Sequence, residues 1–399
     1  MPTVAVSPYR TLEFLEGGGH FWVYLQYVHG LQQAGCDVYW VEHFRSLGGQ
    51  ETSRVDSLLR RLAGYGLADK VILCTDASGA SGPSDPSGAS GAGGGGAQGM
   101  EYTYIGATRS QVHKVFNQAD LLLNFHYAID AELLACFRRT ALVDIDPGLL
   151  QTWMSTGQLS VAPHDVYLTT GATVGMPSAL FPDGGLPWVH IRPPVCLDLW
   201  PYTYDPRCEA FTTVTNWWGE WATETVDGRP VLYDNTKRIA YLSFAGLPRL
   251  TSQPLELAVH LAPDDGAERQ LLERNGWRIR HACEVSRTPE MYRAYIQRSR
   301  GELSCVKPSC VKLQNGWVSD RSLCYLATGK PVVTQDTGAN PYLPWGDGIL
   351  RFATPDEAAE ALATINADYE RHCRSAREIA EAYFDARQIA ERILNVALA

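Results

Sequence analysis

The feature that most constrains the fold is an alternation of short apolar segments with longer amphipathic ones. In the first half of the chain, segments with helical patterning, such as residues 20–35, separate the apolar segments. The apolar segments lie at residues 3–8, 36–42, 70–74, 120–125 and 141–146. Strands that alternate with helices in this way form βα units with parallel strands and right-handed crossovers. The sequence therefore predicts an α/β protein.

The second half of the chain repeats the pattern. Residues 211–216, 239–244 and 255–261 are predicted strands. A helix is predicted over residues 288–300, where Thr occupies the cap and Pro the first position. Thr354 and Glu357 have the spacing of a capping box, which predicts another helix start. A second βα domain therefore follows the first.

The length of the chain and a pair of prolines divide these units between two domains. The 399 residues exceed what one hydrophobic core usually holds. The consecutive Pro193 and Pro194 suit a stiff connection. We predict two Rossmann-like βα domains that face a central cleft, the first over residues 1–195 and the second over residues 205–375. Helices predicted over residues 376–399 can cross back to the first domain.

A tract of low complexity interrupts the first domain. Residues 76–99 consist almost entirely of Gly, Ser, Ala, Pro and Asp, with little to bury. This composition predicts a flexible loop. An inert insertion is favoured over a lid above the cleft.

Charge and cysteine usage exclude several functional classes. The net charge of -10 argues against nucleic acid or an acidic membrane surface as the main partner. The ten cysteines include no C-x-x-C pair, which is typical of a reducing compartment. We read no signal peptide at the N-terminus and no apolar run long enough to span a membrane. We therefore expect a cytoplasmic protein, and its oligomeric state is left open.

Two stretches resemble one known family. Residues 316–338 and 343–362 are similar to the nucleotide-binding half of GT-B glycosyltransferases, nearest to the group-1 and CgeB-like branch. Their shared pattern is a helix that carries a ribose-binding residue, then small-Gly-x-Pro-Val-Val, then a glycine-bearing loop. Residues 17–42 resemble the opening of that family. The resemblance implies a nucleotide-diphosphate sugar donor, a small-molecule or glycan acceptor, and no cofactor or fixed metal. It also implies that residues 1–195 form the acceptor-side domain and residues 205–375 the nucleotide-sugar-binding domain.

The sequence departs from that branch at two positions. Gly316 and Cys324 stand where two Glu residues usually lie. The usual carboxylate contact with the ribose is therefore missing or supplied elsewhere, with Asp320 as one alternative. The nucleobase, the donor sugar and the choice between retention and inversion stay open.

The helix predicted after Ser319 is the first candidate for the donor diphosphate. Ser319 is a suitable N-cap, and free N–H groups beside Arg321 form an anion site. The alternatives are an ordinary capped helix with a solvated Arg, lysines that are surface charges, and a buried Trp217. The residues expected at the donor are Gly18, Gly19, Trp217, Lys237, Lys307, Ser319, Asp320, Arg321, Ser322, Thr337 and Gly338.

Three residues are candidates for catalysis. His20 follows the glycine run and His126 follows a predicted buried strand, so either can act as a general base. A capping or core histidine is the alternative for His20. Asp144 is the third candidate, expected in the cleft.

Asp144 and Asp146 also form the Asp-x-Asp pattern that binds metal in GT-A glycosyltransferases. Because the second βα domain favours GT-B, we expect no metal there. We expect Asp146 to cap a helix that begins at Pro147.

A glycosyltransferase is the function that these patterns favour. A sugar-nucleotide epimerase of the same build is one alternative. A non-catalytic nucleotide-sugar-binding partner protein is another.

Overall fold

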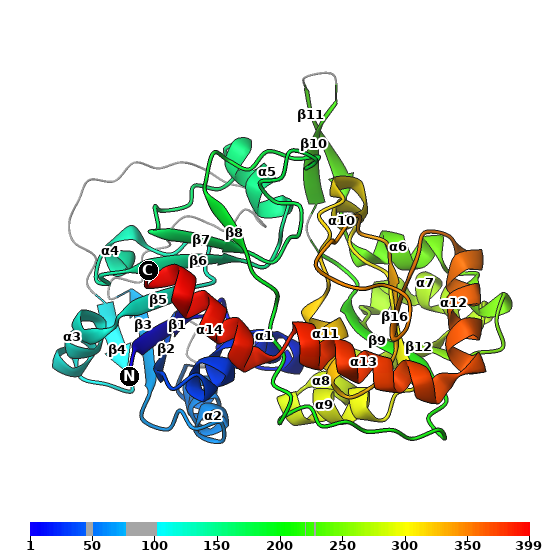
Figure 1. Ribbon diagram of the computed structural model, residues 1–399, viewed down its shortest axis with the longest axis horizontal. Helices are drawn as coiled ribbons and strands as arrows, with labels where there is room; N and C mark the ends of the chain where they lie inside the picture. Colours follow the sequence, from blue (N-terminus) through cyan, green and yellow to red (C-terminus); the bar gives the residue numbers. More distant parts are fainter. Residues whose placement is uncertain (45–50, 77–101, 220, 227–228) are drawn as a thin grey trace.

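The computed structural model describes residues 1–44, 51–76, 102–219, 221–226 and 229–399, which form two βα domains side by side (Figure 1). The first domain has an eight-stranded sheet in the order β4-β3-β2-β1-β5-β6-β7-β8. All of its neighbouring strands are parallel except β3 and β4. The strands are β1 (Thr3–Ser7), β2 (Asp37–His43), β3 (Val71–Asp76), β4 (Tyr102–Ile105), β5 (Leu121–Asn124), β6 (Thr140–Asp144), β7 (Val166–Thr169) and β8 (Trp188–His190).

The second domain has a six-stranded sheet in the order β13-β12-β9-β14-β15-β16, and all of its pairs are parallel. Its strands are β9 (Phe211–Asn216), β12 (Leu255–His260), β13 (Arg278–His281), β14 (Gly301–Ser304), β15 (Val332–Gln335) and β16 (Ile349–Phe352). A separate antiparallel hairpin joins β10 (Trp221–Val226) to β11 (Arg229–Asp234).

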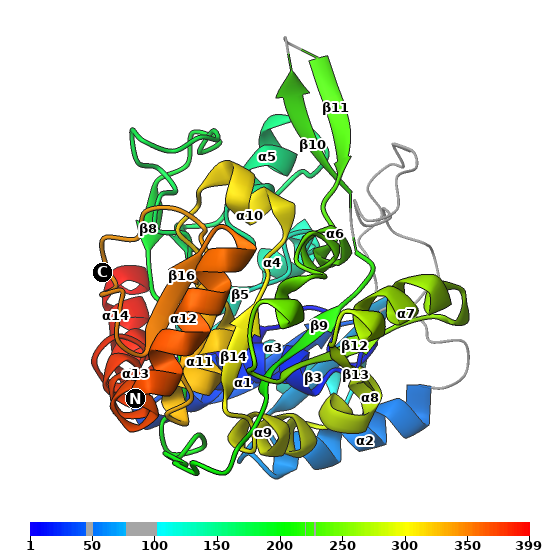
Figure 2. The ribbon, with the colours of Figure 1, turned by 90° about the vertical axis from the view of Figure 1, so that its right-hand side faces the viewer.

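Helices flank the two sheets (Figures 1 and 2). In the first domain they are α1 (Gly18–Gln33), α2 (Glu51–Ala63), α3 (Arg109–Gln118), α4 (Ala131–Leu134) and α5 (Leu149–Ser155). The remaining helices are α6 (Lys237–Ser243), α7 (Gly266–Arg274), α8 (Ala282–Ser286), α9 (Pro289–Gln297), α10 (Pro308–Leu313), α11 (Asp320–Ala327), α12 (Pro355–Ala367), α13 (Tyr369–Tyr383) and α14 (Ala386–Ala397). No helix in the described ranges is long and apolar enough to cross a bilayer.

Local sequence signals account for most of these elements. The strands β5 and β6 are buried along their whole length, as expected for parallel strands covered on both faces. The capping box between Thr354 and Glu357 starts α12 as predicted. The predicted tract at 76–99 lies, apart from Asp76 at the end of β3, outside the described residues.

One predicted strand is wrong. Residues 239–244 belong largely to α6 and not to a strand. The buried residues of this segment are Ala240, Tyr241 and Phe244. These positions, i, i+1 and i+4, lie on one face of a helix. The apolar run was too short for its composition alone to separate strand from helix.

The helix α1 holds the two domains together. Most of its residues are buried, which fits a helix enclosed by neighbours on several sides. The Trp22 ring N–H donates to the carbonyl of Pro289 in the second domain at 2.9 Å. On another side α1 packs against α14, which returns from the second domain to the first (Figure 1). Backbone hydrogen bonds between Val195 and both Phe384 and Ala386 fix this return.

Glycines allow the close approach of α1 to its neighbours. A Cβ added at Gly18 would lie 2.3 Å from the carbonyl oxygen of Thr288. A Cβ added at Gly30 would lie 2.4 Å from the carbonyl oxygen of Ala386. The glycine run predicted to approach a phosphate therefore serves, at Gly18, the contact between domains.

The hairpin forms a second bridge on the other side of the molecule, next to α5 (Figures 1 and 2). The Gln158 side-chain amide donates to the Thr223 hydroxyl at 2.9 Å. Ala222 and Tyr233 pack in a hydrophobic cluster with Trp153 of the first domain. The two domains are thus joined on both sides of the space between them.

We predict that Gly18→Ala destabilises the protein by about 1–3 kcal/mol, because the new methyl group must displace the Thr288 backbone. Gly266→Ala is the matched control, since a Cβ at that helical glycine meets nothing within 4 Å. Urea unfolding of both variants measures the difference. Equal stability of the two variants would contradict the interface role of Gly18.

Candidate functional site

A cavity of about 670 Å³ lies between the two domains. Its first-domain wall comes from the segments after β1 and β6. Its second-domain wall comes from the end of β12 and from the segments after β9, β13 and β14. Parallel sheets bind ligands at this carboxyl edge, where the loops and helix starts converge. Among its lining residues are Phe14, Gly17, Gly19, His20, Trp22, Asp146, Trp217, Trp218, Lys237, Lys307, Trp317, Ser319, Asp320 and Arg321.

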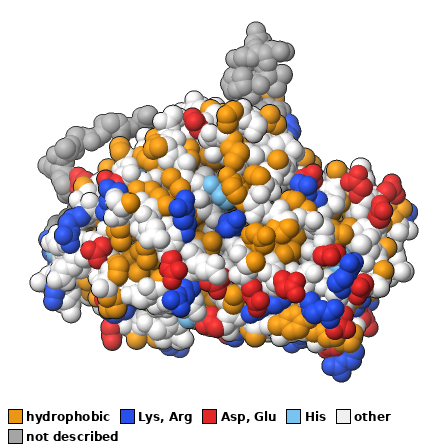
Figure 3. Space-filling view, in the orientation of Figure 1, with side chains coloured by type: hydrophobic (Ala, Val, Ile, Leu, Met, Phe, Trp, Pro, Cys, Tyr) orange, Lys and Arg blue, Asp and Glu red, His pale blue; other side chains and the backbone are white. Residues whose placement is uncertain are grey.

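Two lysines bring positive charge into this cavity. Lys237 is the first residue of α6, and burial, followed by the charges of Arg321 and Lys307, lowers its pKa to about 7. Lys307 lies just before α10, and its ammonium is 3.4 Å from the Asp146 carboxylate. In Figure 3, Lys and Arg are interspersed with Asp and Glu over the visible face. The carboxyl groups of Glu16, Asp146 and Asp320 line the cavity beside these lysines, so the charges of the cavity are mixed as well.

Arg321 lines the cavity, but its guanidinium is not available as predicted. Only 9% of its side chain is exposed, and its Nε donates to the buried Glu302 carboxylate at 2.5 Å. The two terminal nitrogens donate to the Ser304 hydroxyl and the Val214 carbonyl. Burial alone would lower the pKa of Arg321, but Glu302 outweighs it and raises the pKa. Arg321 is therefore not the solvated side chain of the alternative interpretation, and its three nitrogens donate to protein groups where a contact with the donor phosphate was expected.

Neither Asp144 nor Asp146 lies where the sequence suggested. Asp144 is fully buried and accepts hydrogen bonds from Gln151, Thr169 and the backbone N–H of Asp146. Burial raises the pKa of Asp144 to about 7. Asp144 is therefore not a cleft residue.

Asp146 lies two residues further along, beyond the end of β6, and lines the cavity. The cap of the following helix is Gly148, with φ of 86°, and not Asp146. This correction follows because β6 stops at Asp144 and an intervening turn, in place of a helix at Pro147, leads into α5.

The start of α11 contributes part of what was predicted. Ser319 and Asp320 line the cavity, although the Ser319 hydroxyl makes no capping hydrogen bond. Burial raises the pKa of Asp320 to about 7, and the nearby Asp146 acts in the same direction. Ser322 is buried away from the cavity lining. The helix start therefore presents a backbone N–H end together with a carboxyl group that titrates near neutrality.

His20 lies in the first-domain wall of the cavity. Its Nε2 is 2.7 Å from the Tyr9 carbonyl, which can only accept, so Nε2 carries the proton and Nδ1 keeps a lone pair. Burial and the charge of Arg10 lower the pKa of His20 to about 4, while Asp146 opposes them. His126 is outside the cavity lining, and its ring lies against Tyr9 with centroids 5.0 Å apart.

Three residues predicted to contact the donor sugar nucleotide lie outside the cavity lining. Gly18 packs between the domains, as described above. The Thr337 hydroxyl donates to the Trp317 carbonyl at 2.8 Å, and Gly338, with φ of 100°, packs against Gln314. Thr337 and Gly338 therefore hold the loop before α11 without entering the cavity lining.

Of the two neighbouring tryptophans, the second is the more accessible. Trp217 is 1% exposed and donates its ring N–H to Glu268 at 2.6 Å. Trp218 is 53% exposed, and its ring lies against the Arg238 guanidinium. Sequence reasoning selected Trp217, although both line the cavity. It missed Trp218 because adjacent residues of a loop carry no signal that separates buried from exposed rings.

Residues 261–395 match the family model described as glycosyl transferase-like. An alpha-glucosyltransferase solved in complex with UDP-glucose and DNA containing an abasic site is 12% identical, with a TM-score of 0.59 over 100% of this chain and 99% of that chain. HepE of Anabaena in complex with UDP-glucose is 12% identical, with a TM-score of 0.56 over 99% of each chain. A glycosyltransferase from Rickettsia africae is 8% identical, with a TM-score of 0.54 over 99% of this chain and 97% of that chain. No curated protein matches the sequence.

The chain has the GT-B fold. Identities this low show the fold alone, while the match to the glycosyl transferase-like model covers most of the second domain. The predicted fold class is confirmed, and the predicted resemblance is confirmed at the level of the fold and of the second domain's family.

We predict different effects for the two aspartates. Asp144→Asn places an amide NH₂ among three donors, so it should lower the free energy of unfolding by about 1–3 kcal/mol. Asp146→Asn should leave stability nearly unchanged, because Asp146 faces the cavity. Thermal or urea unfolding of the two variants checks this. A destabilisation by Asp146→Asn as large as that of Asp144→Asn would contradict the assignment.

Proposed function

We propose that this GT-B protein transfers a sugar from a nucleoside-diphosphate sugar to a hydroxyl of a small molecule or glycan. The observation that carries the proposal is the inter-domain cavity, where cations of the second domain face a histidine and a carboxylate of the first. Its volume falls within the range of about 300–1,000 Å³ usual for small-molecule sites. The match of residues 261–395 to the glycosyl transferase-like model supports the same activity.

The second-domain wall is the proposed donor side. The leaving diphosphate needs positive charge and hydrogen-bond donors that are fixed before the reaction. Lys237, Lys307 and the N–H groups at the start of α11 supply them. Arg321 contributes by holding that helix start, since its own nitrogens are occupied. The exposed face of Trp218 offers a stacking surface for a base or sugar.

The first-domain wall is the proposed acceptor side. The free lone pair on His20 Nδ1 can accept the proton that the acceptor hydroxyl loses. The pKa of about 4 is low for this task. A bound diphosphate places negative charge in the same cavity and raises the pKa toward neutrality, as the Asp146 carboxylate already does in part. Of the three catalytic candidates from the sequence, His20 is the one that lines the cavity.

We further propose that the transfer itself uses no divalent metal and no cofactor. The lysines named above offset the diphosphate charge that a metal ion would otherwise neutralise. The ten scattered cysteines, which include no C-x-x-C pair, support a cytoplasmic location. Nucleic acid stays an unexpected partner because of the net charge of -10.

We predict that Lys237→Met weakens binding of UDP about 10- to 100-fold, because a charge-assisted contact is worth about 1.5–3 kcal/mol. Lys114→Met, at an exposed position of α3, is the control and should bind as the parent does. Calorimetric titration with UDP measures both. Equal affinity in the two variants would show that Lys237 does not contact the nucleotide.

The pH dependence of UDP binding follows from two groups that titrate near neutrality. Lys237 loses its positive charge as the pH rises through about 7, and Asp320 gains a negative charge in the same range. Both changes disfavour the binding of the negatively charged diphosphate, so the affinity for UDP should fall as the pH rises. The fall should be smaller in Lys237→Met, which lacks one of the two groups.

The activity test uses a panel of nucleoside-diphosphate sugars with candidate acceptors. Release of nucleoside diphosphate with formation of a glycoside supports the proposal. Isomerisation of the donor sugar without release indicates an epimerase, and binding without either reaction indicates a non-catalytic binding protein.

We predict that His20→Gln lowers the transfer rate at least about 100-fold, in the range general-base catalysis usually contributes. UDP affinity should be retained, because the Gln amide can still donate to Tyr9. His126→Gln is the control and should keep its rate. A larger loss of rate in His126→Gln than in His20→Gln would indicate that His126 is the general base.

A further inference from the structure

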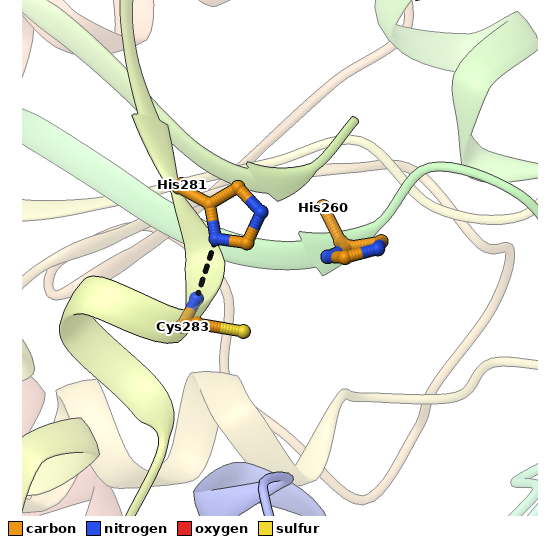
Figure 4. Close-up of side chains that lie close together, drawn as sticks. All are labelled: His260, His281 and Cys283. Carbon is orange, nitrogen blue, oxygen red and sulfur yellow. Dashed lines mark hydrogen bonds between the residues drawn. The ribbon is translucent and has the colours of Figure 1, made fainter. Parts of the chain in front are cut away.

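A second group of reactive side chains lies at the edge of the cavity. His260 ends β12, His281 ends β13, and Cys283 lies in the first turn of α8 (Figure 4). One nitrogen from each ring and the Cys283 sulfur all lie within 4.8 Å of one another. The paired strands place both histidines at the same carboxyl edge, with ring centroids 4.9 Å apart. In Figure 4 the three side chains surround a common space.

The ligand set fits one class of ion. Imidazole and thiolate are the ligands of Zn²⁺ in proteins, which prefers four ligands in a tetrahedron. Ca²⁺ and Mg²⁺ prefer oxygen ligands, and the cluster offers none from its side chains. Three protein ligands leave a fourth position for water or another ligand. The rings of His260 and His281 are exposed and can rotate. Small rotations can bring their nitrogens and the Cys283 sulfur to the distances at which side chains bind an ion.

The side chains are available for this role. Within the described ranges, the His260 ring has no hydrogen-bond partner, and the Cys283 thiol has none either. His281 Nδ1 accepts a hydrogen bond from the Cys283 backbone N–H at 3.3 Å. This bond is longer than the usual 2.9–3.0 Å or so for a donor nitrogen, so an ion can displace it at small cost.

We propose that His260, His281 and Cys283 bind one Zn²⁺ ion at the wall of the inter-domain cavity. His260 and Cys283 both line that cavity, so the ion would be reachable from it. The ion would tie β12, β13 and α8 together at the rim. This site is separate from the proposed transfer chemistry, and its test does not depend on activity.

The test uses the full-length protein, reduced and freed of metal by a chelator. Titration with Co²⁺ alone should produce thiolate-to-cobalt charge-transfer absorption, and Zn²⁺ should abolish it at one equivalent per chain. Cys283→Ser should lose the absorption and bind Zn²⁺ at least about ten-fold more weakly, the factor that corresponds to about 1.4 kcal/mol. Cys136→Ser, a half-buried thiol of the first domain, is the matched control and should behave as the parent.

His260→Ala provides a second variant. Its side chain is exposed and has no hydrogen bond in the described ranges, so its loss should leave the metal-free fold intact. It should also weaken Zn²⁺ binding, and melting of the metal-free proteins checks their folding. The proposal is overturned if the parent shows no charge-transfer absorption. It is also overturned if Cys283→Ser or His260→Ala, once folded, binds Zn²⁺ as tightly as Cys136→Ser.

Discussion

The buried ion pair between Arg321 and Glu302 is the interaction on which the second-domain side of the cavity depends. It joins the start of α11 to β14, and the remaining guanidinium nitrogens reach Ser304 on β14 and the Val214 carbonyl on β9. Breaking such a pair by removing one partner typically costs about 3–5 kcal/mol, because the other charge is left buried. The helix start is therefore fixed in place before any ligand arrives. Asp320 and Ser319 owe their positions in the cavity wall to this anchor.

The cavity also depends on how the two domains are held. The glycines of α1 allow backbone contact with Thr288 and Ala386, and the hairpin joins the second domain to the region of α5. A site built from two domains needs such contacts, since neither wall alone encloses a ligand. The two bridges lie on different sides of the cavity and limit how far the walls can separate.

Charges inside the cavity are balanced rather than uniformly positive. Lys307 is close to Asp146, while Lys237 and Asp320 have pKa values moved toward neutrality from opposite directions. Burial favours the neutral forms of Lys237 and Asp320, because each charged form loses hydration. An arriving diphosphate would favour the protonated forms of both. The cavity can thus adapt its charge to an anionic ligand although the whole chain is negative.

Sequence alone determined the two βα domains, because the periodicity of strands and helices depends on residues close together in the chain. This periodicity can be recognised without tertiary contacts. The sequence also determined single helix starts such as Thr354. Several residues at or just after the ends of predicted strands, among them Asp146 and Lys307, line the inter-domain cavity. Tertiary structure decided which of the neighbouring polar residues enter the cavity. Asp144 ends β6 and Asp146 lies two residues beyond it, but Gln151 and Thr169 enclose only Asp144. Arg321 and Glu302 are 19 residues apart, and His260 approaches Cys283 only because β12 and β13 pair. Such partners are chosen by the packing of distant segments, for which spacing along the chain carries no signal.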